Sequence, residues 1–214
     1  MLVIRNITQL LAGTTGVVGA AICVNDHQIT WIGQSADLQS LPPDAEVIDA
    51  AGKTILPGLI DSHTHLIFAG SREDEFEQRL QGKTYQEIAA HGGGINATVR
   101  RVRQASKEEL KRLARPRLQR MMSFGVTTVE VKSGYGLSLE DELKCLEAIA
   151  ELNAEGPVEL VPTFLGAHAV PPEYQSDRDG YIRVLCNSML PEVARNRLAE
   201  FCDVFCEKGV FSVP

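Results

Sequence analysis

Two histidines close an apolar strand candidate in the segment "LPGLIDSHTHL", residues 56–66. Residues i and i+2 of a β-strand point to the same side, so His63 and His65 can direct two imidazole nitrogens at one point. Neutral imidazole is a ligand of Zn²⁺ and similar ions, and Asp61 stands where a carboxylate could orient one ring. The spacing indicates a metal site, although a chance HxH in a solvated loop stays open from the pattern alone.

Three more polar side chains of interest follow apolar segments. Glycines flank Tyr135 in "KSGYGL" and permit a tight loop that exposes the phenol, and His168 ends the apolar run "VPTFLGAH". Arg72 in "SREDEF" has a planar fork of donors suited to a carboxylate. For each of the three a structural role is the alternative: a packed aromatic, a structural histidine and a surface ion pair with a neighbouring acid. Tyr85 in "TYQEI" is either a packing residue or a further ligand contact.

Net charge and missing motifs argue against several classes of function. The chain has 214 residues and a net charge of −7, which argues against nucleic acid as a partner because phosphate binding needs a basic face. No Walker loop or GxGxxG motif occurs, so nucleotide enzymes are excluded. "HGGG" at residues 91–94 resembles the oxyanion motif of lipases, but the GxSxG nucleophile elbow is missing.

Cysteine usage and apolar runs bear on the compartment. The five cysteines form no CxxC pair, which favours a reducing cytosol, and we expect Cys202 and Cys206 in "CDVFC" to fill the core rather than bind metal. The N-terminus lacks the order of a signal peptide, and no apolar run reaches membrane-spanning length. We therefore expect a cytoplasmic protein without a membrane partner.

The chain reads as two parts, 1–54 and 55–214. Residues 1–54 read as short strands separated by turn signals, including a hairpin at "VNDHQI", and form a small β module. Beyond them, strand candidates at 54–66, 126–133, 158–168 and 202–209 alternate with helical segments. We expect caps at Ser106, in a capping box with Glu109, and at Ser138, and Pro116 as a possible kink.

Alternating strands and helices predict four parallel strands, apolar on both faces, joined by right-handed crossovers. A doubly wound sheet and a (β/α)₈ barrel both fit this pattern. In either fold, the chemistry lies at the carboxyl ends of the strands. The histidine pair, Tyr135 and His168 all stand at such ends, so we expect them, together with Arg72, at one mouth.

Several motifs resemble a known family. "LPGLIDSHTHL" after a small β module resembles the amidohydrolase superfamily, whose members are metal hydrolases built on a (β/α)₈ barrel. "SHTHLIFAGSREDEF", "SFGVTTVEVKSGYGL", "GAHAVPPEY" and "CDVFCEKGVFS" resemble the imidazolonepropionase family of that superfamily, over nearly the whole chain. The resemblance implies an α/β fold: residues 55–214 as the first four β/α units of a TIM-type barrel, preceded by residues 1–54 as part of a composite β-sandwich.

The resemblance also implies an activity. The family hydrolyses the C–N bond of 4-imidazolone-5-propanoate to N-formimidoyl-L-glutamate in histidine degradation. His63 and His65 match its metal ligands on the first strand, for one Zn²⁺ or Fe³⁺ ion per site. Arg72, Tyr135 and His168 match residues that bind the substrate, a small molecule with a carboxylate tail.

The remaining functional residues of the family have no match here. They are a histidine on the fifth strand and an aspartate on the eighth, the latter being the general base, and we expect both beyond Pro214. Residues 1–214 alone are therefore not expected to catalyse, and the full-length enzyme is expected to be a homodimer. Two alternatives stay open: a nucleobase-type deaminase of the same superfamily, disfavoured by "KSGYG" and by a carboxylate-seeking arginine, and a non-catalytic metal-binding half-barrel.

Overall fold

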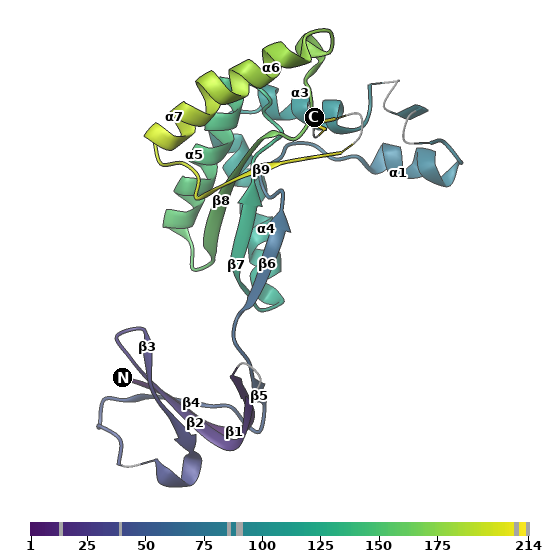
Figure 1. The fold of residues 1–214 in the computed structure, drawn as a ribbon. Helices are drawn as coiled ribbons and strands as arrows, with labels where there is room; N and C mark the ends of the chain where they lie inside the picture. The colour runs from purple at the N-terminus through teal and green to yellow at the C-terminus, as the bar shows by residue number, and fades with distance from the viewer. Residues whose placement is uncertain (13–14, 39, 85–86, 89–91, 208–209, 213–214) are drawn as a thin grey trace. The chain divides into compact units, whose positions relative to one another are not determined.

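The computed structural model describes residues 1–212 except 13–14, 39, 85–86, 89–91 and 208–209. The chain divides into two compact units, Met1–Gly58 and Leu59–Pro214, which are described separately (Figure 1). The described residues of the first unit form strands and one short 3₁₀ turn, whereas the second unit alternates strands with helices.

The first unit is a small β-sheet in the order β3-β2-β1-β4, with β5 also paired to β1. Its strands are β1 (Leu2–Ala12), β2 (Thr15–Asn25), β3 (Gln28–Gln34), β4 (Glu46–Asp49) and β5 (Thr54–Ile55), and the short 3₁₀ turn η1 covers Ser35–Asp37. The predicted hairpin at "VNDHQI" is confirmed: Asp26 and His27 both have positive φ, as a two-residue type I′ turn requires. Ile7, Leu10 and Ile22 anchor its apolar cluster.

The second unit contains four parallel strands that pair in chain order, β6-β7-β8-β9. The strands are β6 (Leu59–Thr64), β7 (Val126–Lys132), β8 (Glu159–Ala167) and β9 (Phe201–Val204). The helices are α1 (Glu73–Leu80), α3 (Ile95–Gln104), α4 (Lys107–Ser123), α5 (Leu139–Glu155), α6 (Arg178–Val184) and α7 (Leu190–Arg195), with short turns η2 (Pro172–Tyr174) and η3 (Leu185–Met189). Pairing in chain order is the arrangement of a half-barrel, and it removes the reversed strand order of a doubly wound sheet.

The main core lies between this sheet and the helices along it (Figure 1). Val129 and Val131 of β7 are 0% exposed and pack in one cluster with Leu146 and Ile149 of α5. The alternate residues of β7 are polar, and Glu130 and Lys132 form an ion pair. The prediction of strands apolar on both faces is therefore wrong for β7, because the described helices supply an apolar layer to only one of its faces.

The strand predicted at 54–66 is two strands in the structure. Residues Thr54–Ile55 pair with β1 in the first unit, and β6 begins only at Leu59 in the second. Pro57 lies between them and cannot donate to a ladder, so the two pieces of backbone separate there.

Two helices begin at the serine N-caps that the sequence predicts. Ser106 and Ser138 accept hydrogen bonds from the backbone N–H groups of Glu109 and Asp141, each at 3.2 Å, which confirms both caps. The reciprocal half of the capping box is not formed, because the Glu109 carboxylate pairs with Arg112 instead. Helix α4 continues through Pro116 to Ser123.

Cysteine placement differs from expectation at two positions. Cys23 and Cys145 are buried, whereas Cys202 and Cys206 are exposed, so the prediction that the latter two fill the core is wrong. They lie on and beside β9, which ends the described sheet and is covered by no further strand. Among the described helices, none is long and apolar enough to cross a bilayer.

We predict that Ile149→Ala lowers the free energy of unfolding by ~2–5 kcal/mol, because the fully buried side chain leaves a cavity among β7 and α5. The measurement is urea unfolding of the intact protein encoded by the reading frame that contains residues 1–214. Arg112→Ala, which removes a side chain 66% exposed, is the control and should change stability by less than ~0.5 kcal/mol. Equal losses in the two variants would contradict the core assignment.

Candidate active site

Four rings from three strand ends meet at the carboxyl edge of the parallel sheet. The centroid of the His65 ring lies 4.7 Å from that of Tyr135 and 4.7 Å from that of His168, and the His63 ring lies 6.1 Å away. Tyr135 and His168 are themselves 5.3 Å apart. Residues more than a hundred positions apart in the chain are thus in one cluster, as parallel strands require.

The histidine pair lies at the end of β6, on the same side of the strand. Both rings extend from alternate residues, and their 6.1 Å separation is within reach of two ligands of one ion, whose Zn–N bonds are ~2.0–2.1 Å. Asp61 accepts a hydrogen bond from the backbone N–H of His63 at 3.4 Å. Asp61 therefore contacts the strand backbone, where we expected it to contact an imidazole ring.

His65 is suited to remain neutral and to donate a lone pair. Burial, the largest cause, together with the nearby His168, His63 and Lys132, lowers its pKa to about 4. Its Nδ1 is buried and has no hydrogen-bond partner. A neutral imidazole with a free ring nitrogen fits a transition-metal ion, since such ions bind the unprotonated form.

A complete metal site needs more ligands than this pair. Within the described ranges, no three histidine, cysteine, aspartate or glutamate side chains gather where they could hold one ion. Catalytic zinc sites have three protein ligands, so the two imidazoles account for only part of one.

His168 is fixed by stacking and by one hydrogen bond. Its ring is stacked on His65 with an interplanar angle of 9°, and its Nδ1 lies 2.8 Å from the carbonyl oxygen of Gly134. Since a carbonyl only accepts, Nδ1 carries the proton, and Nε2 is the ring's acceptor when the ring is neutral. Burial lowers the pKa of His168, so the neutral form is favoured near pH 7.

A charge cluster centred on a buried lysine lies beside the rings, on the polar face of the sheet. Lys132, 7% exposed, donates to Glu130 at 2.7 Å and to Asp203 of β9 at 3.0 Å. These pairs join β7 to β9, which do not pair directly with each other. The sequence signal for this cluster is the alternation of apolar and charged residues in the strand "VEVK", which does not by itself predict the pairing with Asp203.

Arg72 is held by contacts outside the ring cluster. At the start of α1 its Nε donates to Glu75 at 2.9 Å, and Glu75, 6% exposed, also accepts from the backbone N–H of Gly94. Arg72 lines a cavity of about 210 Å³ together with Arg100 and Arg101. The ion pair with a neighbouring acid, foreseen as the alternative, is thus formed, although its carboxylate is buried rather than at the surface. The substrate role of Arg72 stays a prediction. Tyr85 lies outside the described residues.

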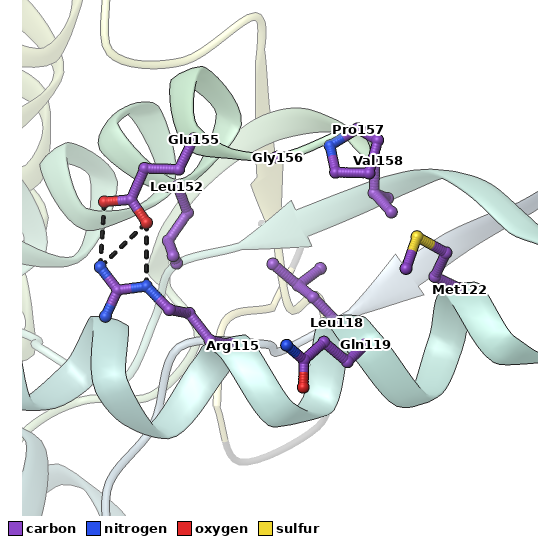
Figure 2. Close-up of a pocket in the computed structure, with 9 residues that line it drawn as sticks. All are labelled: Arg115, Leu118, Gln119, Met122, Leu152, Glu155, Gly156, Pro157 and Val158. Atoms are coloured by element: carbon purple, nitrogen blue, oxygen red, sulfur yellow. Dashed lines mark hydrogen bonds and ion pairs between the residues drawn. The ribbon is translucent and has the colours of Figure 1, made fainter.

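A second cavity, of about 250 Å³, lies between the carboxyl-terminal turns of α4 and α5 (Figure 2). Leu118, Leu152 and Val158 line it, and an ion pair of Arg115 with Glu155 stands at its border. These residues precede β7 and β8, so the cavity is at the amino edge of the sheet, opposite the rings. It therefore belongs to the packing of the helices and not to the candidate site.

The chain is similar in sequence to known proteins. The model of the Amidohydrolase family matches residues 46–101. The chain is 50% identical, over 99% of its length, to an imidazolonepropionase of Geobacillus thermodenitrificans (strain NG80-2), of which it covers 54%. The chain thus spans about half the length of the curated relatives it matches.

Solved structures share the fold. One of 5-methylcytosine deaminase from Klebsiella pneumoniae is similar with a TM-score of 0.57 and 19% identity, over 95% of this chain and 51% of that chain. A mutant atrazine chlorohydrolase from Arthrobacter aurescens, complexed with zinc and atraton, is similar with a TM-score of 0.52 and 19% identity, over 77% of this chain and 36% of that chain. At these identities the likeness concerns the fold alone.

We predict that acid destabilises the metal-free protein between about pH 6.5 and pH 4. Unfolded His65 binds a proton near 6.5, whereas the folded ring does so only near 4, so the unfolded state binds more protons in this window. The free energy of unfolding should therefore fall as the pH drops. Urea unfolding at pH 7 and pH 5 should show a weaker pH dependence in His65→Gln than in the wild type.

The matched control is His27→Gln, in the exposed hairpin of the first unit, which should keep the wild-type dependence. An identical pH dependence in the wild type and in His65→Gln would contradict the burial argument.

Proposed function

We propose that this chain, an amidohydrolase-family homologue of the imidazolonepropionases, carries metal-ligating and substrate-binding residues of an enzyme that hydrolyses the ring C–N bond of 4-imidazolone-5-propanoate. The product would be N-formimidoyl-L-glutamate. The observation that carries the proposal is the convergence of His63, His65, Tyr135 and His168 at the carboxyl edge of the half-barrel.

His63 and His65 would hold one zinc or iron ion. Such an ion, when bound, supplies Lewis-acid chemistry: it lowers the pKa of a water molecule and polarises a carbonyl. The lowered pKa of His65 supports this role, because the ring stays unprotonated at neutral pH. The structurally similar atrazine chlorohydrolase is complexed with zinc, so zinc is the first ion to test.

The other residues would bind and orient the substrate. The phenol of Tyr135, next to His65, would contact the imidazolone ring. His168 would present Nε2 as an acceptor to a ring N–H, because Nδ1 is committed to the Gly134 carbonyl. Arg72 has guanidinium donors besides the Nε that binds Glu75, and these would take the propionate.

Parts of the enzyme lie outside this set of residues. We propose that the remaining metal ligands and the general base belong to a second half-barrel, whose strands would extend the sheet at β9. We also propose a cytoplasmic location, a small-molecule substrate and a homodimeric full-length enzyme, by analogy with the imidazolonepropionases. Barrel closure would cover the polar face that carries Lys132.

The proposal is tested with the intact protein encoded by this reading frame. Loaded with zinc or iron, it should consume 4-imidazolone-5-propanoate. The double variant His63→Ala/His65→Ala should lose the bound metal and ~10³-fold in kcat/KM, since several kcal/mol of transition-state stabilisation depend on the ion. Metal content by elemental analysis and substrate loss by absorbance are the two measurements.

His27→Ala, which removes an exposed histidine of the first unit, is the control and should retain both metal and turnover. Wild-type protein that binds the metal but leaves the substrate unchanged would refute the proposed activity. Full metal content in the double variant would refute the ligand assignment.

Arg72→Ala should raise KM by ~10-fold or more with little change in kcat, because it removes a contact to the propionate that is the same in the ground and transition states. Arg79→Ala, an exposed arginine of the same helix, is the control and should leave both constants unchanged. An unchanged KM for Arg72→Ala would leave the arginine with only its ion pair to Glu75.

A further inference from the structure

The loop that carries Tyr135 is held by a buried carboxylate. Residues 133–137, here called the Tyr135 loop, follow β7 and precede α5. Glu142 of α5 is 0% exposed and accepts from the backbone N–H groups of Gly134 at 3.0 Å, Gly136 at 2.8 Å and Leu137 at 2.8 Å. The Ser133 side chain also bonds to it. Burial raises the pKa of this carboxyl, and the four donors act against that rise because they bond best to ionised oxygens.

The carbonyls of the same loop are held by a second side chain. Arg103, in the last turn of α3, donates from Nε to the Gly136 carbonyl at 2.8 Å and from Nη2 to the Leu137 carbonyl at 3.1 Å. Nη2 also donates to Glu173 at 2.8 Å. The loop is thus fixed at its amides by Glu142 and at its carbonyls by Arg103.

The backbone of the loop has little freedom to adopt another shape. Gly134 has φ of +101°, and a Cβ there would lie 2.7 Å from the Leu165 carbonyl oxygen. A Cβ on Gly136 would lie 2.5 Å from the backbone of Asp141. Leu137 is left-handed with φ of 53°, a conformation that persists only where the surroundings impose it.

The loop connects directly to the rings of the site. Tyr135 contacts His65 and His168, and the Gly134 carbonyl accepts from Nδ1 of His168. A displacement of the loop would therefore move the phenol and release the hydrogen bond that selects the tautomer of His168. The sequence offered one signal: Glu142 occupies the apolar stripe that continues through Cys145, Leu146 and Ile149.

We infer that Glu142 and Arg103 are positioning residues of the proposed active site, which fix the Tyr135 loop and through it the phenol of Tyr135 and the acceptor nitrogen of His168. The inference rests on the proposed function. Neither side chain touches the substrate in this account, and both act through the loop backbone.

The first experiment does not depend on turnover. Histidine ring ¹⁵N resonances of the intact protein, with His168 assigned from His168→Asn, should show His168 in one tautomer with Nδ1 protonated. In Glu142→Gln an amide NH₂ faces backbone donors, so the loop should shift and the resonance should move or split into two tautomers. Glu140→Gln, an exposed neighbour in the same helical turn, is the matched control and should give the wild-type spectrum.

The second experiment measures coupling in the reaction. Glu142→Gln should lower kcat/KM by ~10–100-fold, comparable with the loss of residues that orient a ligand of the site. In the Tyr135→Phe background, the factor by which Glu142→Gln lowers kcat/KM should be at least ~5-fold smaller than in the wild-type background. The reason is that both changes affect the same phenol. Arg103→Lys, which keeps the charge but loses the fork, should show the same coupling and covers the case in which Glu142→Gln does not fold.

The outcomes separate the two hypotheses. Wild-type protein without turnover refutes the proposed function, and the ¹⁵N spectra then still decide the role of Glu142. An unchanged His168 tautomer in folded Glu142→Gln and Arg103→Lys overturns the inference. Losses that multiply independently with Tyr135→Phe also overturn it, since they would indicate an anchor that acts on stability alone.

Discussion

The candidate site depends on one constraint, the parallel pairing of four strands in chain order. Parallel strands place every carboxyl end at the same edge. The side chains at the ends of β6, β7 and β8 therefore meet there, although they are far apart in the sequence. The stacked rings of His65 and His168 are the direct result, although 102 residues lie between them in the chain. Antiparallel pairing would have distributed the same residues between two edges.

The two faces of this sheet are stabilised by different interactions. Val129 and Val131 face the helices and supply the apolar burial that stabilises the unit. Glu130 and Lys132 alternate with them on the other face, where the ammonium is shared with Asp203 of β9. Removing one partner would leave a buried charge uncompensated, so this polar face is held together by pairing rather than by hydrophobic contact.

Two buried carboxylates, Glu142 and Glu75, have similar hydrogen-bonding roles. Glu142 accepts the amides of the Tyr135 loop, and Glu75 accepts the amide of Gly94 while it binds Arg72. Each holds a glycine-containing loop whose backbone donors would otherwise be unsatisfied. In both cases a helix supplies the carboxylate, so the rigidity of that helix is transferred to backbone amides outside it.

The sequence by itself determined the elements and the candidate residues. Alternating strands and helices, the serine caps of α4 and α5, and the HxH pair are all local patterns, and local propensity and side-chain periodicity are enough to read them. The resemblance carried by "KSGYG" and "GAHAVPPE" added the expected roles of Tyr135 and His168. Tertiary structure alone decided the half-barrel order of the strands, because strand pairing is a contact between distant segments. It also decided the partners of two charged groups that local patterns left open: the amides of the preceding loop for Glu142, and Glu75 rather than another neighbouring acid for Arg72, since partner choice depends on which groups lose water on folding.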